Sequence, residues 1–125
     1  MKLMVSITFF QVEGAEELSF GDDTFDAVFD FGVIHHIPNW QGAIVEIHRV
    51  LKPGGIFILE DLSNETFTGP IGGFIKRITD HPYSAMYSQS SFEERLNKTG
   101  FVIENRQTFT NFGLLRYFSI VARKK

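Results

Sequence analysis

The sequence has no cysteine among its 125 residues. This absence excludes a disulfide framework and a zinc site with cysteine ligands. A chain of this length with 43% hydrophobic residues can bury enough apolar surface to fold without such cross-links. The lack of cysteine fits a reducing compartment, so we expect a cytoplasmic protein. We also expect residues 1–125 to form a single domain.

An excess of positive charge and long apolar runs are missing too. The net charge of −3 and the pI near 5.8 argue against a nucleic-acid partner, because binding to a phosphate backbone needs a dense cationic face. No apolar run approaches the ~20 residues that span a bilayer. Residues 1–10 also lack the small-residue cleavage site of a signal peptide. We therefore expect neither a nucleic-acid nor a membrane partner.

Two strands are predicted in the first quarter of the chain. Residues 5–12 are rich in β-branched and aromatic side chains, which is typical of a strand. In residues 25–31 only Asp26 and Asp30 are polar. Such a nearly continuous apolar run predicts a strand that is covered on both faces, as in a parallel sheet.

A helix follows, with clear signals at both ends. Asn39 is suited to cap its N-terminus, because a short polar side chain can accept a hydrogen bond from an orphan backbone N–H. Apolar side chains then recur at helical spacing, at Trp40, Ala43, Ile44, Ile47 and Leu51. The sequence Lys-Pro-Gly-Gly at residues 52–55 ends the helix, and residues 56–59 are predicted to form the next strand.

The rest of the chain contains an insert, a helix and a hairpin. Residues 61–87 lack strong periodicity, apart from a short helix expected at 74–79, and such a segment is often a lid or a substrate-facing insertion. Ser90 and Glu93 have the spacing of a capping box for a helix over residues 92–97.

Residues 101–110 and 112–121 are predicted to be two strands of an antiparallel hairpin, because a short connection joins them. The fold class is therefore α/β, with a mostly parallel sheet, flanking helices and an antiparallel hairpin at the C-terminal edge.

Three motifs, in this order and spacing, resemble the class I S-adenosylmethionine-dependent methyltransferases. They are AEELSF at residues 15–20, FDAV followed by VIHHI within residues 25–37, and RVLKPGG at residues 49–55. The resemblance covers the C-terminal half of that family's Rossmann-like fold. The glycine-rich loop and the acidic ribose-binding residue of the family have no counterpart in this sequence.

The resemblance implies a site for S-adenosylmethionine. By resemblance, the loop of Gly14, Ala15 and Glu16 would approach the adenine. Asp30, Phe31 and Gly32 would line the methionine and sulfonium end.

The resemblance also places His35 and His36 at the mouth of the substrate pocket, where they are candidate catalytic residues. An alternative is that one histidine packs against the helix and the other is solvated. A metal site is disfavoured, because two adjacent histidines do not easily bind one ion and no third ligand is evident. Asp30 has an alternative role as the cap of the loop that follows it. Glu60 and Asp61 lie at the end of the next predicted strand. Each of them could likewise either contact the cofactor or cap the loop that follows.

The resemblance implies methyl transfer to an unknown small molecule. The alternative is a non-catalytic dimerisation or regulatory module with an incomplete cofactor site. A third interpretation is a truncated gene product or a domain fragment. Since an apolar, unpaired strand edge is an association site, we expect a homodimer built across the sheet edge where the family's first strands would lie.

Overall fold

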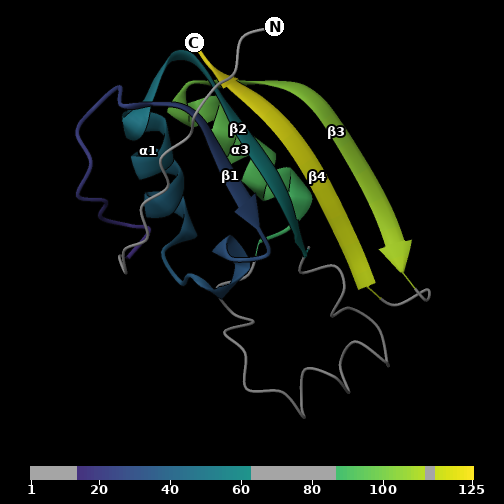
Figure 1. Ribbon diagram of the computed structural model, residues 1–125. Coiled ribbons are helices and arrows are strands. Elements are labelled where there is room, and N and C mark those ends of the chain that lie inside the picture. The colour runs from purple at the N-terminus through teal and green to yellow at the C-terminus, as the bar shows by residue number, and fades with distance from the viewer. Residues whose placement is uncertain (1–13, 63–86, 112–114) are drawn as a thin grey trace, which may run out of the picture.

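The computed structural model describes residues 14–62, 87–111 and 115–125 (Figure 1). The strand predicted at residues 5–12 and the short helix predicted at 74–79 lie outside the described residues. The connection between the last two strands also lies outside them.

Four strands, two helices and one short 3-10 turn make up this part. Their bounds are β1 Phe25–Phe31, η1 Ile34–His36, α1 Trp40–Val50, β2 Leu51–Leu62, α3 Gln89–Thr99, β3 Phe101–Asn111 and β4 Leu115–Lys124.

The strands form one mixed sheet in the order β1-β2-β4-β3. β1 and β2 are parallel, and α1 connects them. β4 is antiparallel to both of its neighbours, β2 and β3. The predicted α/β fold with a C-terminal antiparallel hairpin is confirmed. The described sheet is mixed, and not mostly parallel as predicted, because β4 is antiparallel to β2 as well as to β3.

Helix α1 begins and packs as its sequence predicts. The side chain of Asn39 accepts a hydrogen bond from the backbone N–H of Gly42 at 3.1 Å. The predicted apolar face is buried, although Leu51 is the first residue of β2 and not the last of the helix. The strand begins there because the backbone of Leu51 is already extended.

The Lys-Pro-Gly-Gly segment interrupts the pairing of β2 with β1. Phe25 pairs with Leu51, whereas Ala27 pairs with Ile56. Residues 52–55 of β2 therefore lie opposite a single residue of β1, Asp26, and form a bulge in the ladder of hydrogen bonds. Gly54 lies within this bulge at φ 81°, a left-handed backbone conformation that glycine adopts without a steric penalty.

Helix α3 begins earlier than the sequence suggested. Ser88, and not Ser90, is its N-cap, and Ser91 completes the capping box in place of Glu93. The Ser91 hydroxyl and the Ser88 hydroxyl each accept from the other residue's backbone N–H, at 3.1 and 3.2 Å. Glu93 instead forms an ion pair with Arg106 on β3 at 2.9 Å.

Both helices pack on one face of the sheet, and α3 lies behind β2 and β4 in Figure 1. Alternate residues of the central strands point into this core: Phe57, Leu59, Phe118, Ile120 and Ala122. On the opposite face, Phe29 and Phe31 of β1 are 58% and 65% exposed. The prediction that this strand is covered on both faces is therefore wrong for its last residues. Its apolar side chains alternate between the core and an open face.

Candidate functional site

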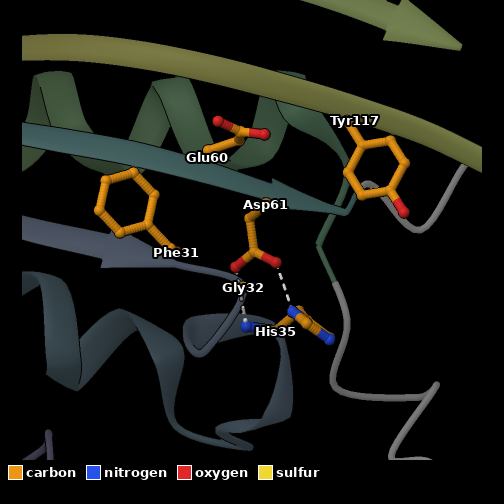
Figure 2. Close-up of a pocket in the computed structure, with 6 residues that line it drawn as sticks. All are labelled: Phe31, Gly32, His35, Glu60, Asp61 and Tyr117. Carbon is orange, nitrogen blue, oxygen red and sulfur yellow. Dashed lines mark hydrogen bonds and ion pairs between the residues drawn. The ribbon is translucent and has the colours of Figure 1, made fainter.

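A cavity of about 270 Å³ lies where the parallel strands β1 and β2 end (Figure 2). Its lining residues come from β1, the loop after it, β2 and β4: Phe31, Gly32, His35, Glu60, Asp61 and Tyr117. Ligands of open α/β sheets bind outside the carboxyl ends of parallel strands. The cavity lies at that position.

Both faces of the sheet contribute to the cavity. Phe31 pairs with Glu60, and their side chains belong to the open face. Asp61 is the next residue of β2, so its side chain turns to the helix-covered face, where it is 1% exposed. The cavity therefore has an aromatic, open side and a buried, polar side.

Asp61 organises the buried side. Its Oδ2 atom accepts a hydrogen bond from the backbone N–H of His35 at 3.1 Å. Its Oδ1 atom accepts a second hydrogen bond from Nδ1 of the same histidine. Figure 2 shows both contacts reaching from β2 to the loop after β1. One carboxylate thus fixes both the backbone and the ring of His35.

Tyr87 completes this network from the start of the segment that leads into α3. Its hydroxyl donates to Oδ2 of Asp61 at 2.5 Å. Its ring packs against Trp40 and Phe92 and is 2% exposed. Burial, followed by the charge of Asp61, raises the pKa of Tyr87. The hydroxyl therefore keeps its proton and acts as a donor.

Asp30 lies at the end of β1, beside this network. It accepts hydrogen bonds from the backbone N–H groups of Val33 and Ile34, at 3.1 and 3.4 Å. The alternative interpretation of Asp30 as a loop cap is thus realised in the structure. Burial, followed by the charge of Asp61, raises the pKa of Asp30 to about 6. Two carboxyl groups within one small buried region cannot both ionise without cost.

The cavity has the chemistry of a site for a cation. Glu60 is exposed at its rim, and Asp61 lies within it. Phe31 and Tyr117 add aromatic rings, whose faces attract positive charge. Among the described residues, no group of three or more metal-ligating side chains is placed to hold a metal ion.

Three of the eight residues predicted for the cofactor and catalytic sites line the cavity: Phe31, Gly32 and His35. His36 is exposed, and its ring packs on that of His35 with the centroids 3.9 Å apart. Asp30 is buried behind the lining. The roles of these residues stay predictions.

The predicted adenine loop lies elsewhere: Gly14, Ala15 and Glu16 are not lining residues of the cavity. The segment after this loop is tied to the outer side of α1. The backbone N–H of Leu18 donates to Glu46 at 2.9 Å, and Arg49 donates to the carbonyl of Leu18 at 3.0 Å. Arg49 also donates to the carboxylate of Glu46 at 2.8 Å. This hydrogen bond, followed by the one from the Leu18 N–H, lowers the pKa of Glu46 to about 2.

Arg49 also forms hydrogen bonds with residues further along the same segment. It donates to the carbonyl of Phe20 and to Asp22, each at 2.9 Å, and it also pairs with Glu46. The ion pair between Glu46 and Arg49 therefore belongs to a larger network.

Sequence reasoning missed two residues of the site. Tyr87 lies at the end of the insert of residues 61–87, and Tyr117 is one residue of the strand predicted at 112–121. For Asp61 the sequence leaves two interpretations open. One sequence signal points to Asp61: it is a charged residue at the end of an apolar strand, where burial of a charge needs a polar partner. The same signal applies to Asp30.

Comparisons with known proteins identify relatives of the chain. The model of a family described as a methyltransferase domain matches residues 3–59. An uncharacterised methyltransferase of Synechocystis is 44% identical over 66 residues, which are 49% of this chain and 31% of that protein. The sterol 24-C-methyltransferase of Candida albicans is 31% identical over 101 residues, which are 70% of this chain and 25% of that protein. The chain thus spans about a third or less of the length of these curated relatives.

The fold matches solved structures more completely. A S-adenosylmethionine-dependent methyltransferase from Methanosarcina mazei superposes with a TM-score of 0.71 at 22% identity, covering 91% of this chain and 66% of that one. The predicted partial Rossmann-like methyltransferase fold is therefore confirmed.

Over residues 3–59 the chain is thus similar to the methyltransferase-domain family, and the curated relatives that it matches are named as methyltransferases. Its relatives support a methyltransferase-like function. None of the helices in the described ranges has the length and apolarity that crossing a membrane requires.

Proposed function

We propose that the chain takes part in methyl transfer from S-adenosylmethionine to a small molecule. The observation that carries this proposal is the acidic and aromatic cavity at the carboxyl ends of β1 and β2. When bound, S-adenosylmethionine supplies a methyl group on a positively charged sulfur. The carboxylate of Glu60 and the rings of Phe31 and Tyr117 would hold that charged end.

The size of the cavity supports a site for one end of the cofactor. Sites that enclose a whole ligand have volumes of about 300–1,000 Å³, whereas this cavity has about 270 Å³. The adenine end would extend beyond it, towards the loop of Gly14, Ala15 and Glu16. Nuclear magnetic resonance with adenosine as the probe tests this placement, because the amide signals of the loop should shift. Shifts confined to other residues would contradict it.

The identity of the methyl acceptor can be tested by activity assays with candidate compounds. Several relatives are named as sterol methyltransferases, so sterols are the first acceptors to assay. We propose that an acceptor approaches the cavity beside His35, and that His35 and His36 have their catalytic role at this place. Most of the rate gain in such a transfer comes from proximity and orientation.

Calorimetric titration with S-adenosylmethionine and S-adenosylhomocysteine tests the proposal. We expect both compounds to bind with micromolar dissociation constants. No heat of binding with millimolar ligand would rule out methyl transfer by this chain alone.

The variant Glu60→Gln sharpens the experiment. It removes a negative charge at the cavity rim, so it should weaken S-adenosylmethionine, which carries the sulfonium charge, more than S-adenosylhomocysteine, which lacks it. Exposed charge pairs contribute about 0.2–1 kcal/mol, so the ratio of the two affinities should change up to about fivefold. Glu94→Gln on the exposed side of α3 is the matched control. Equal effects on both ligands would show that Glu60 does not face the sulfonium.

We also propose that the chain forms a homodimer through the edge of β1. Within the described ranges, β1 pairs only with β2. Phe29 and Phe31 are exposed beside this edge, with stacked rings whose centroids are 6.2 Å apart. An exposed apolar edge strand invites pairing with another chain.

Light scattering tests the dimer, with an expected mass twice that of one chain. Phe29→Lys should convert it to monomer, because a charge on an edge strand opposes pairing. Val102→Lys is the control, since Val102 is 43% exposed on β3, at the other edge of the sheet. A monomeric parent chain at all concentrations would disprove the dimer.

The non-catalytic alternative gains no support from the comparisons, whose relatives are named as methyltransferases. Its test is the same titration, because a purely structural module would bind neither ligand.

A further inference from the structure

A second hollow lies between the two helices, and it shares no lining residue with the cavity at the strand ends. Helices α1 and α3 pack against each other through Trp40 and Phe92, whose rings are stacked with centroids 5.7 Å apart. The hollow has a volume of about 180 Å³, and we call it the helix groove. Its lining residues are Trp40, Gln41, Ser91, Glu94, Arg95 and Lys98.

Arg95 is a cation of the helix groove whose guanidinium group has no hydrogen-bond or ion-pair partner within the described part of the chain. Neighbouring cations are paired: Lys98 contacts Glu94 at 2.8 Å, and Arg106 contacts Glu93 at 2.9 Å. Arg95 is also half-buried, so part of its side chain is held away from water. A guanidinium group with free donors at such a position favours an oxygen ligand.

Trp40 and Gln41 give the helix groove an aromatic wall and further donors. Trp40 is 7% exposed, and its indole N–H has no acceptor within the residues that the structure describes. A buried indole N–H usually has a hydrogen-bond partner. The side-chain amide of Gln41 is likewise without a partner there. The lining thus combines apolar surface with donors for an oxygen ligand.

The charges of the helix groove favour a singly charged anion. Arg95 and Lys98 are positive and Glu94 is negative, so the lining has a net positive charge. The hydrogen bond from Lys98 lowers the pKa of Glu94, which therefore stays ionised. Its negative charge repels a phosphate dianion more strongly than a monocarboxylate. The planar guanidinium group also matches a carboxylate, to which it can donate two parallel hydrogen bonds.

We propose that the helix groove binds a small monocarboxylate with an apolar body, with the carboxylate at Arg95 and the apolar part against Trp40. The volume of the groove limits the size of this ligand. Sites that enclose a drug-sized ligand have about 300–1,000 Å³, whereas the helix groove has about 180 Å³. A ligand with a chain of a few carbons therefore fits. This site is independent of the proposed methyl transfer.

Titration of the intact chain with butyrate, followed by nuclear magnetic resonance, tests the proposal. Butyrate has a carboxylate and a short apolar chain, and butyramide has the same shape without the charge. We expect butyrate to shift the Nε–H signal of Arg95 and the indole N–H signal of Trp40, the only tryptophan, with a millimolar dissociation constant. Butyramide should shift neither signal. Equal responses to the two compounds, or a response to butyrate that does not saturate, would overturn the proposal.

Inorganic phosphate is the second probe, and it tests the class of anion. We expect phosphate to bind more weakly than butyrate, because it lacks an apolar body and is repelled by Glu94. Tighter binding of phosphate would overturn the assignment of the helix groove to a monocarboxylate.

Two variants of the lining should change the affinity for butyrate in opposite directions. Arg95→Gln should weaken it about tenfold or more, because hydrogen bonds between charged groups are stronger than neutral ones. Glu94→Gln should strengthen it, because it removes a like charge at an exposed position. Arg106→Gln is the control, since Arg106 is a cation outside the helix groove. An unchanged affinity in both lining variants would contradict the proposed site.

Glu60→Gln separates the helix groove from the proposed cofactor site. Glu60 lines the cavity at the strand ends and not the helix groove, so this variant should bind butyrate as the parent chain does. A loss of butyrate binding in Glu60→Gln would place the ligand in the other cavity and overturn the proposal. The affinity for S-adenosylmethionine decides the proposed function separately.

Discussion

Gly100 shows how much a single residue can constrain this fold. It ends α3 with φ at 116°, and a Cβ atom there would lie 2.9 Å from Nε2 of His48. Gly100→Ala should therefore lower the free energy of unfolding by roughly 1–2 kcal/mol, because the backbone conformation is strained for alanine and the histidine must move. Urea unfolding measures the loss.

Gly21→Ala is the matched control. A Cβ atom at Gly21 would come no closer than 3.8 Å to its nearest neighbour, and its φ lies outside the left-handed region. It should change the stability little. Equal losses in the two variants would contradict the proposed strain at Gly100.

Asp30 makes the stability depend on pH. Its pKa of about 6 in the folded state lies above the ordinary value of 3.8. The folded state therefore binds more protons than the unfolded state between these pH values, and stability is lost as the pH rises through this window. The ionised Asp30 costs the fold roughly 3 kcal/mol at neutral pH.

Asp30→Asn should remove this dependence. The difference in unfolding free energy between the variant and the parent should move in favour of the variant as the pH rises from 4 to 6. Urea unfolding at several pH values measures it. Asp26→Asn, at an exposed position of the same strand, is the control. A constant difference across the window would show that Asp30 titrates normally.

At the scale of elements, Arg49 joins α1 to the segment before β1. Its planar guanidinium group donates to several acceptors at once, including the carbonyls of Leu18 and Phe20. Lysine cannot reproduce this fork. Arg49→Lys should increase the amide hydrogen exchange of Leu18 several-fold and leave the strands unaffected.

Arg106→Lys is the control for that experiment, because Arg106 is an exposed partner of Glu93 on β3. Slower or unchanged exchange at Leu18 in the Arg49 variant would mean that Glu46 alone holds the segment.

The elements were more predictable from the sequence than their contacts. The limits of β1 and the cap of α1 follow from apolar periodicity and one asparagine, both of which are local. The start of α3 differs from the prediction because Ser88, Ser90 and Ser91 offer competing caps. The contact of Asp61 with His35 joins residues 26 positions apart, so it depends on the pairing of β1 with β2. No local pattern encodes it.

At the scale of the whole molecule, the described residues share one core cluster, to which both helices and three of the strands contribute buried residues. Such a core predicts a single cooperative unfolding transition. Trp40 is the only tryptophan and is buried in this core, so its fluorescence reports on packing. We expect its midpoint in urea to coincide with that of far-ultraviolet circular dichroism. Separate midpoints would reveal two independent units.

The order of the strands has a consequence for synthesis on the ribosome. β4 is the last strand in the sequence, but it lies in the sheet between β2 and β3. Until residues 115–124 leave the exit tunnel, β3 has no neighbour in the sheet and β2 lacks one of its two. A ribosome that pauses before this point would expose unpaired strands to chaperones. The sheet can close only when its last strand inserts between the other two.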